Sequence, residues 1–561
     1  MPKTWFVGAG RAGLPPAQTG DRLIPLSAMA QSLIPGGGGS PVEIAALETQ
    51  AQSRVFADLA AFAAAIQTRA PTRRWFRYGE YDLSPVFRRP DEAMAGFPNQ
   101  ATAFEVGSAA SWTGPLEAWG ADSFQVSGLR AALGGVVTVA PKNDRTPTAA
   151  ALPRGLFRRR PSAGARPCDI LYLSLEPHVA LQQDRVLSLL SDRYGIVAVG
   201  LQRTSWPWPE EMRFTPREHP PLISYLRPTD LVRAVGSWAM RPNPGPTYVE
   251  YVRWMSARER DQWLRTTWLR AASVSDALAR AIETHRPRLI IGTNLASGMG
   301  TVIASCAAHH GVAVMSLPTG ADCLVPPQFD PGDAGETRFV VPGGIAERLR
   351  QAGVQSEQLL ACGWPELDAI VDAGNADLGS FRRQLGLDSK KPLVVFFSSP
   401  STANDELVVP AQVKERALRR LAESCLLEGF QLAVKLHPRE TDGVMERVAG
   451  EISPQPLVFR ESLSILLHLA DVVATVGSAV SFAGVALGKP TVILEADSIR
   501  STAALFASVS VGSQPRSLEE LTAFLRSAAN RSIDVGDSRD LWGADGKVAE
   551  RIRAEVDRML S

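Results

Sequence analysis

Apolar residues after Asp169 alternate between short continuous runs and runs with helical spacing. Continuous runs stand at 170–173, 196–199, 289–291 and 312–315. Such short, almost wholly apolar runs are typical of strands that are buried on both faces of a sheet. Between them, helical spacing is visible from about 179 to 190 and at Val274, Leu278, Ala281 and Ile282. This alternation predicts a parallel sheet with helices on both faces.

A second series of the same kind begins near Phe339. Its apolar runs stand at 393–397, 431–436, 457–459, 471–475 and 491–494. Gly429 predicts the end of the helix between the first two runs, and Ser517 with Glu520 predicts a capping box later. The last helix has Val548, Ile552, Val556 and Met559 on one side. The sequence therefore predicts two α/β units, and we expect the last helix to pack back on the first of them.

Changes in composition divide the chain further. We expect a small N-terminal accessory domain of α/β type at 1–142, a Pro/Arg-rich linker at 143–167, an α/β domain at 168–335, a second α/β domain at 336–545 and a C-terminal helix at 546–561. The linker contains Arg158-Arg159-Arg160, which indicates either a solvated connection or a contact with anionic lipid or substrate.

An insertion at about 202–268 interrupts the first α/β domain and is rich in tryptophan. It contains Trp206, Trp208, Trp238, Trp254, Trp263 and Trp268. These residues favour a helical subdomain with its own small core, and the alternative is a stacking surface for a sugar acceptor.

Composition excludes several classes of protein. The 561 residues carry 59 basic and 58 acidic side chains, whereas proteins that bind nucleic acid broadly are strongly basic. The five cysteines form no CxxC pair, so we expect a reducing compartment and no zinc knuckle. The first residues lack a signal-peptide pattern. The uncharged stretch 289–321 is interrupted by glycines and reads as a buried strand–helix–strand unit. We expect a cytoplasmic protein, placed either free or at the inner face of the membrane.

The first motif, Gly8-Ala9-Gly10-Arg11-Ala12-Gly13, has the GxGxxG spacing of a dinucleotide site. Such a site needs a helix that begins at once, with amides that face the pyrophosphate. Pro15 and Pro16 disfavour that helix, and no acidic residue ends a strand about 20 residues later, where the ribose is bound. We therefore interpret the motif as a glycine-rich turn and expect no cofactor.

Four segments of the second series carry the candidate chemistry. They are Gly363-Trp364-Pro365-Glu366-Leu367-Asp368, Phe396-Phe397-Ser398-Ser399-Pro400, Lys435-Leu436-His437-Pro438-Arg439-Glu440, and 471–481 with Gly477-Ser478 and Ser481, followed by Gly488-Lys489-Pro490. Ligands of open parallel sheets bind outside the carboxyl ends of the strands, where we expect three of these segments to meet. Free amides and hydroxyls there suit a phosphate, and a histidine donates a hydrogen bond to a departing phosphate.

The ordered set of segments at about 335–500 resembles the donor domain of GT-B transferases of bacterial surface polysaccharides. The resemblance is greatest to the CDP-glycerol glycerophosphotransferase and capsule-polysaccharide group, and extends to UDP-GlcNAc 2-epimerases and to sialyltransferases with a His-Pro pair. It implies two Rossmann-like domains that face a cleft. It implies His437 as a ligand of the donor phosphate, and Ser478 and Ser481 as phosphate binders at a helix start. From their place at the strand ends, we expect the donor site to include also Ser398, Ser399, Lys435, Pro438, Arg439 and Gly477.

The resemblance also implies a reaction. A sugar passes from a CMP-, CDP- or UDP-linked donor to a glycan, glycolipid or glycoprotein acceptor, and His437 stabilises the leaving phosphate. GT-B enzymes commonly place the base after the first strand of the first α/β domain, where Glu176 and His178 stand. Relatives often have a doubled serine where this chain has Ser478-Ala479, and Gln-His-Gly near 317–320. A nucleotide-sugar 2-epimerase and a non-catalytic scaffold are the alternatives.

Other polar residues receive weaker assignments. Asp322 follows another strand end, and His309-His310 reads as surface or core. The pair His219-Pro220 lies in a proline-rich loop and is interpreted as structural. No acidic pair of the DxD kind stands at a sugar-binding turn, so we expect no required metal. The sequence does not specify the sugar, the acceptor or the oligomeric state.

Overall fold

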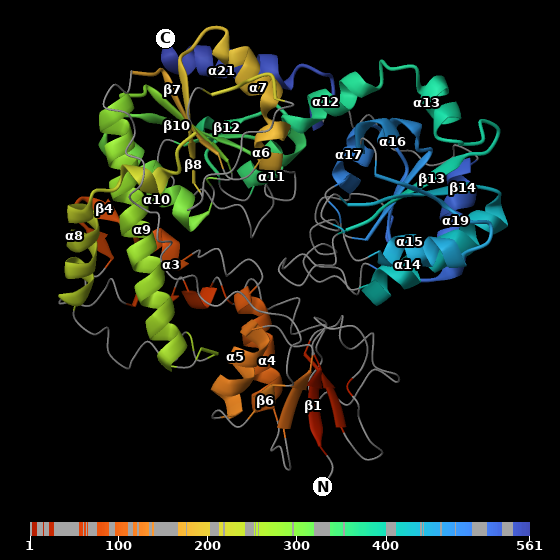
Figure 1. Cartoon of the computed structure of the whole chain (residues 1–561), viewed down its shortest axis with the longest axis horizontal. Coiled ribbons are helices and arrows are strands. Elements are labelled where there is room, and N and C mark those ends of the chain that lie inside the picture. Colours follow the sequence, from red (N-terminus) through yellow and green to blue (C-terminus); the bar gives the residue numbers. More distant parts are fainter. Residues whose placement is uncertain are drawn as a thin grey trace. The chain divides into compact units, whose positions relative to one another are not determined.

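The computed structural model divides the chain into two compact units. It describes 167–201, 212–241, 252–318, 337–399, 411–495, 513–529 and 542–561, with short gaps, and shorter stretches within 3–139. One unit contains Met1–Gln52, Ala95–Ala140 and Ala369–Gly546; the other contains Ser53–Met94, Pro141–Asp368 and Lys547–Ser561. Figure 1 labels their helices and strands. No helix among the described residues is long and apolar enough to cross a bilayer.

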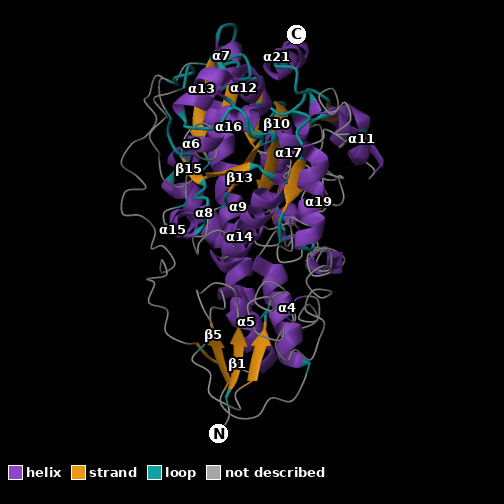
Figure 2. Ribbon diagram, turned by 90° about the vertical axis from the view of Figure 1, so that its right-hand side faces the viewer, coloured by secondary structure: helices purple, strands orange, loops and turns teal. Residues whose placement is uncertain are grey.

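The N-terminal residues form a four-stranded parallel sheet in the order β2-β1-β5-β6. Its strands are β1 (Thr4–Val7), β2 (Arg22–Pro25), β5 (Leu116–Trp119) and β6 (Thr138–Val139). Helices α4 (Gly96–Ser108) and α5 (Ser123–Leu133) lie beside these strands (Figure 2). A Cβ on Gly128 would lie 2.0 Å from the Gln100 carbonyl oxygen, so this glycine allows the two helices to pack closely.

A six-stranded parallel sheet forms the core of the second unit, in the order β12-β11-β10-β9-β7-β8. Its strands are β7 (Ile170–Ser174), β8 (Ile196–Gly200), β9 (Leu289–Thr293), β10 (Ala313–Leu317), β11 (Arg338–Val340) and β12 (Leu359–Leu360). The four strands predicted after Asp169 are confirmed, and most of their predicted ends lie within one residue of the observed ends. Chain order reverses between β7 and β9, which makes this point the switch of the sheet.

Helices cover both faces of this sheet, as the alternation predicted. One face packs against α7 (Asp184–Ser191) and α21 (Val548–Leu560), and the other against α9 (Ala257–His285) and α10 (Gly298–His309). Shorter helices are α6 (Pro177–Gln182), α8 (Pro228–Ala239) and α11 (Gly343–Gln351). The last helix, α21, buries Val548, Ile552 and Val556 against the first α/β sheet. Its expected return to that sheet is therefore confirmed.

A five-stranded parallel sheet forms the second α/β domain, in the order β15-β14-β13-β16-β17. Its strands are β13 (Leu393–Phe397), β14 (Gln431–Lys435), β15 (Leu457–Phe459), β16 (Val472–Thr475) and β17 (Thr491–Ile493). Helices α14 (Ala411–Glu428), α15 (Val444–Glu451) and α19 (Leu518–Ala529) bury their apolar faces against one side. The remaining helices are α12 (Glu366–Ala373), α13 (Leu378–Gln384), α16 (Leu463–Leu469) and α17 (Val480–Ala486). The prediction of two Rossmann-like α/β domains is confirmed.

Local helix signals also fall where the sequence placed them. Gly429 follows the last residue of α14 with a φ of +73°, a conformation that glycine adopts without a steric penalty. The Ser517 hydroxyl accepts a hydrogen bond of 3.1 Å from the Glu520 amide at the start of α19. The Glu520 carboxylate accepts from the Arg516 amide instead of closing back on Ser517.

The segment 53–94, which we expected inside the accessory domain at 1–142, groups with the first α/β sheet instead. Its hairpin β3 (Arg77–Tyr78) and β4 (Tyr81–Asp82) and its helix α3 (Ser84–Arg88) pack on α9 and α10. The cause is aromatic packing: Phe87 contacts Trp263, and Tyr78 meets the edge of Trp268. The sequence shows no strand–helix rhythm here that would reveal these long-range contacts.

The buried tryptophans favour the core interpretation of the insertion. Trp254, Trp263 and Trp268 are buried, and Trp263 and Trp268 belong to the same continuous helix, α9, that carries Leu278. Trp263 contacts Phe62, and Trp268 contacts Tyr78. Since Phe62 and Tyr78 belong to the segment 53–94, the core is shared with that segment and is not confined to the insertion. Trp206 and Trp208 lie outside the described residues.

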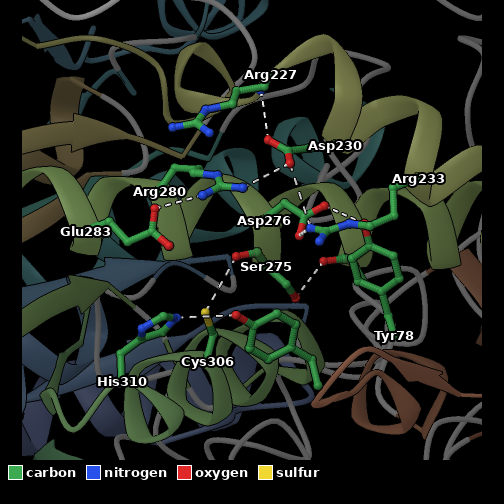
Figure 3. A network of polar contacts seen from close by, with 12 residues as sticks. Tyr78, Arg227, Asp230, Arg233, Ser275, Asp276, Arg280, Glu283, Cys306 and His310 are labelled. Atoms are coloured by element: carbon green, nitrogen blue, oxygen red, sulfur yellow. Dashed lines mark hydrogen bonds and ion pairs between the residues drawn. The ribbon is translucent and has the colours of Figure 1, made fainter. Parts of the chain in front are cut away.

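A polar network fastens the hairpin to α8 and α9 (Figure 3). The Tyr78 hydroxyl donates a 2.5 Å hydrogen bond to Asp276 and accepts one of 3.0 Å from Arg233, which also pairs with Asp276. Burial raises the pKa of both Tyr78 and Asp276. Arg280 pairs with Asp230 at 3.3 Å one turn further along α9. The network gives a buried carboxylate the charged and hydrogen-bonding partners that it needs in an apolar environment.

Beside this network, Tyr81 anchors the hairpin to α10. Its hydroxyl lies 3.3 Å from Nε2 of His310, the residue that follows the helix, and its ring meets the edge of His309. Burial lowers the pKa of His310. The two histidines thus take part in packing. Among the described residues, no group of three His, Cys, Asp or Glu side chains could hold a metal ion.

Candidate functional site

Three strand ends of the second α/β sheet lie in register. Lys435 of β14 and Thr475 of β16 both pair with Phe397, the last residue of β13. The loops that carry Ser399, His437 and Ser478 therefore leave the same edge of the sheet. This edge is also the switch point, since β14 follows β13 on one side and β16 lies on the other. Open α/β sheets bind their ligands at such a point.

Ser398 and Ser399 are buried and connect the central strand to its neighbours. The Ser398 amide donates to the Lys435 carbonyl at 2.9 Å, and the Ser399 hydroxyl donates to the Val476 carbonyl at 3.0 Å. These bonds fix the loops after β14 and β16 to the end of β13. Their predicted contact with a donor stays a prediction, and Pro400 lies outside the described residues.

Lys435 has a buried ammonium group that binds the main chain. It donates a 2.6 Å hydrogen bond to the carbonyl of Leu436. A buried cation beside a strand end also makes the local potential positive, which favours an anion there. Its role as a donor ligand stays a prediction.

His437 follows β14 at the start of a tight turn. The Glu440 amide donates a 2.9 Å hydrogen bond to the His437 carbonyl, which closes a four-residue turn with proline in the second position. His437 is half-buried. Pro438 and Arg439 lie outside the described residues. The sequence therefore placed the histidine correctly at the carboxyl edge, and its contact with phosphate is not yet tested.

The end of β16 leads directly into α17. The Thr475 hydroxyl donates to the Phe397 carbonyl at 3.2 Å and accepts from the Ser478 amide at 3.2 Å. The Ser478 hydroxyl accepts from the Val480 amide at 3.4 Å and is part of a half-buried residue. Ser481 is buried, and its hydroxyl donates to the Ser478 carbonyl at 2.8 Å. Gly477 lies outside the described residues.

The sequence reasoning missed the charged residues that stand behind this edge. Lys414 in α14 and Glu440 form a buried ion pair. Glu495, which follows β17 with a φ of +53°, pairs with Arg416 at 2.9 Å and with Arg420 at 3.6 Å. A signal for Lys414 was available, because the lysine is in phase with the apolar stripe that includes Leu418, Leu421 and Cys425, where a solvent-exposed lysine does not belong.

The first segment of the ordered set has a structural partner in the C-terminal helix, within the same compact unit. Both carboxylate oxygens of Asp368 accept hydrogen bonds from the start of α21, at 2.9 Å from the Val548 amide and at 2.8 Å from the Ala549 amide. Gly363 has a φ of +108°, which explains the glycine before this turn. Asp368 thus caps the C-terminal helix.

The switch point of the first α/β sheet carries a second set of polar residues. His178 lies in α6 just after β7, and Glu176 and Asp322 lie outside the described residues. Nε2 of His219 lies 2.6 Å from the Ser174 hydroxyl at the end of β7. The backbone beside His219 pairs with Gly200 through a 3.0 Å bond from Gly200 to Pro220. The structural interpretation of the His219-Pro220 pair agrees with these contacts.

A buried chain of hydrogen bonds crosses the same switch point. The Tyr172 hydroxyl donates to Gln183 at 2.8 Å, and the Gln183 amide donates to the Thr293 hydroxyl at 3.4 Å. These bonds connect the ends of β7 and β9 through the loop before α7. Burial raises the pKa of Tyr172, which keeps its hydroxyl as a proton donor.

Comparison with known proteins finds similarity at the level of structure. No protein-family model and no curated protein matches the chain. Solved structures that resemble it include UDP-GlcNAc 2-epimerase from Neisseria meningitidis bound to UDP-GlcNAc (10% identity, 69% of this chain, 99% of that chain, TM-score 0.41). Another is the UDP-GlcNAc 2-epimerase of Methanocaldococcus jannaschii (11% identity, 69% of this chain, 99% of that chain, TM-score 0.43). A third is the wall teichoic acid polymerase TagF (12% identity, 70% of this chain, 89% of that chain, TM-score 0.39).

The similar structures include UDP-GlcNAc 2-epimerases, one of the classes that the motifs resemble, and the wall teichoic acid polymerase TagF. At these identities and TM-scores, they leave the activity of this chain open.

Proposed function

We propose that the protein is a GT-B glycosyltransferase of bacterial surface polysaccharide synthesis. It moves a sugar from a CMP-, CDP- or UDP-linked donor to a hydroxyl of a glycan, glycolipid or glycoprotein. One observation carries the proposal: the strand ends that precede His437 and Ser478 are in register on either side of β13, at the switch point of the second α/β sheet. A phosphate is the ligand that an imidazole and a hydroxyl suit at this place.

In the proposed chemistry, some residues of the site touch the donor phosphate and others hold the loops that carry them. His437 and Ser478 are half-buried, so they are the residues that touch the donor phosphate; the expected ligands Pro438, Arg439 and Gly477 stand beside them in sequence. His437 donates a hydrogen bond to the leaving phosphate as negative charge develops. The buried residues Ser398, Ser399, Lys435 and Ser481 hold the loops and supply local polarity.

On the acceptor side, we propose that Glu176 or His178 removes the proton from the attacking hydroxyl. Both follow β7 at the switch point of the first α/β sheet. A general base contributes by holding the acceptor proton in the transition state, and its loss typically costs about 10²–10⁴-fold in rate. No metal takes part in this scheme.

A nucleotide screen tests the proposal. The full chain is titrated with CMP, CDP, UDP and GDP, and unfolding is followed by thermal shift and binding by calorimetry. A ligand at 100 times its Kd stabilises the folded chain by about 2.7 kcal/mol. We expect one pyrimidine nucleotide to bind and His437→Ala to weaken it. A failure of all four nucleotides to bind would favour the non-catalytic scaffold.

The matching sugar nucleotide then separates the two enzymatic functions. A transferase releases free nucleotide in the presence of acceptor, whereas an epimerase converts UDP-GlcNAc into its 2-epimer and needs no acceptor. Chromatography of nucleotides and proton NMR of the sugar ring distinguish the two products. Accumulation of the epimer would replace the transferase proposal.

We also infer that the protein associates peripherally with an anionic membrane through α8. This helix has inverted polarity: Asp230 faces inward and is buried, while Val232, Val235 and Met240 are 71%, 50% and 82% exposed. The turns of the helix place Leu231, Val232 and Val235 on one outward face. An apolar helix face that points to water indicates a partner.

The charges beside this face favour lipid over a second copy of the chain. Arg227 precedes α8 and is exposed, and the Arg233 side chain, which pairs with Asp276 on its inner side, is still 56% exposed. Arg241, just after α8, binds the carbonyl of Arg77, so two more arginines lie at the end of the helix. Basic residues beside an apolar helix face suit anionic head groups, whereas two copies of this surface would bring like charges together.

A further inference from the structure

The main chain of His437 is held from both ends by one residue, Glu440. The Glu440 amide donates to the His437 carbonyl at 2.9 Å. One carboxylate oxygen of Glu440 accepts from the His437 amide at 3.4 Å. The peptide groups on both sides of the histidine are therefore fixed, and these two contacts limit the directions in which the imidazole leaves the turn.

Glu440 is in turn held by Lys414. The other carboxylate oxygen pairs with the Lys414 ammonium, and both side chains are 0% exposed. The ammonium also donates to the Ser399 carbonyl at 3.0 Å. Lys414 comes from the first turn of α14, so the pair joins a helix, the loop after β13 and the turn after β14. Arg460 adds a 3.4 Å hydrogen bond to the Glu440 carbonyl.

A buried ion pair is poor evidence for stability alone, because desolvation of both charges offsets their attraction. Apolar side chains of similar volume often stabilise such a site equally well, so stability alone does not account for the pair. Here the fixed geometry includes both peptide groups of His437 and the carbonyl of Ser399. Each of these stands at the switch point of the sheet.

We infer that Lys414 and Glu440 are positioning residues, which hold the His437 imidazole in the direction of the donor phosphate. This inference rests on the proposed function, since it assigns a task to the same site. Neither residue touches the donor: both are enclosed, and both act through the turn 437–440. Loss of the pair frees the turn, and the imidazole then spends less time in the binding geometry.

A double-mutant cycle on nucleotide affinity tests this inference. A single substitution would leave a buried unpaired charge and endanger folding, so Lys414→Met and Glu440→Leu are combined in one apolar variant. Calorimetry gives the Kd of the nucleotide found in the screen for four proteins: the natural chain, His437→Ala, the paired variant and all three substitutions together. Circular dichroism and thermal unfolding establish that each is folded.

We expect the paired variant to bind roughly tenfold more weakly than the natural chain. We also expect His437→Ala to have little further effect in that background, because the imidazole is already displaced. If the ion pair had a purely structural role, His437→Ala would weaken binding by the same factor in the natural chain and in the paired variant. The matched control is Arg526→Gln with Glu428→Gln, a partly exposed ion pair of 2.8 Å that joins α19 to the far end of α14. This change should leave the Kd unchanged.

The outcomes separate the inference from the function on which it rests. If the natural chain binds and His437→Ala weakens binding, the site is correct. A paired variant that then binds as tightly as the natural chain, or that keeps the full effect of His437→Ala, overturns the positioning role alone. If the natural chain binds no nucleotide, the proposed function and the positioning role fall together.

Discussion

The carboxylate of Asp368 caps a helix that begins 180 residues later in the chain, at Val548. The same carboxylate is wholly buried and also binds the amide of Ala549. Two amides at a helix start carry partial positive charge, so a carboxylate is a favourable partner there. This contact ties the C-terminal helix α21 to α12, the helix that follows the last strand of the first α/β sheet.

Substitution of Asp368 by Ala should therefore destabilise the unit that contains α21. The loss of a helix cap costs about 0.5–2 kcal/mol, and a buried site is expected near the upper end. Urea unfolding followed by circular dichroism measures the change. Asp377→Ala, which removes the cap of α13 at an exposed site, is the matched control and should cost less.

The stability contributed by Asp368 should also depend on pH. Burial raises the pKa of Asp368 above its ordinary value of 3.8. As the pH rises through the interval between the unfolded and folded pKa, the unfolded chain releases the proton first, so the free energy of unfolding falls. In the Asp368→Asn variant the side chain cannot ionise, so its free energy of unfolding does not fall for this reason as the pH rises. Urea midpoints of both proteins at several pH values should therefore shift in favour of the variant as the pH rises from about 4.

An unchanged difference between the Asp368 and Asn proteins across that pH range would contradict the assignment. Comparison of the two proteins cancels the titration of other carboxylates that both share. The measurement therefore isolates the one buried group.

Tyr78→Phe should weaken the attachment of the hairpin to α9. The substitution removes a 2.5 Å hydrogen bond to the buried Asp276 carboxylate, and a bond to a charged group contributes about 1.5–3 kcal/mol. Tyr194→Phe is the control, since Tyr194 donates the same kind of bond, also 2.5 Å, to the more exposed Asp557. Equal losses in urea unfolding for the two variants would show that the burial of Asp276 is unimportant.

Ser478→Ala should lower nucleotide affinity, because we propose that the hydroxyl of this half-buried residue touches the donor phosphate. The loss of one hydrogen bond to a charged ligand is expected to weaken binding by about tenfold. Calorimetry with the nucleotide of the screen measures the change. Ser191→Ala, on the surface of α7, should bind as the natural chain does.

Val232→Glu with Val235→Glu should release the protein from anionic membranes. The two glutamates place negative charge on the outward face of α8, which is then repelled by acidic head groups. Sedimentation with phosphatidylglycerol vesicles measures the bound fraction. The matched control is Leu426→Glu with Leu427→Glu, two exposed apolar residues of α14. If the α8 variant still binds the vesicles and the α14 variant does not, the membrane-binding surface lies on α14.

Much of the candidate site followed from the sequence because parallel strands align their carboxyl ends. His437 and Ser478 stand two and three residues beyond their strands, and the strands pair with the same residue of β13. A parallel sheet in which both strands flank β13 brings the two residues to one edge. The residues that support them could not be assigned in the same way, because Lys414 meets Glu440 through the rotation of a helix and the path of a turn.

Sequence patterns predicted the two series of strands and helices, the ends of several helices and the edge at which the polar motifs meet. These features depend on hydrophobic period and on local backbone chemistry, which act over a few residues. Tertiary structure decided that Asp368 caps α21, that Tyr78 reaches Asp276 and that the segment 53–94 leaves the accessory domain. Those contacts join residues that are far apart in the chain, and only the packing of buried side chains selects them.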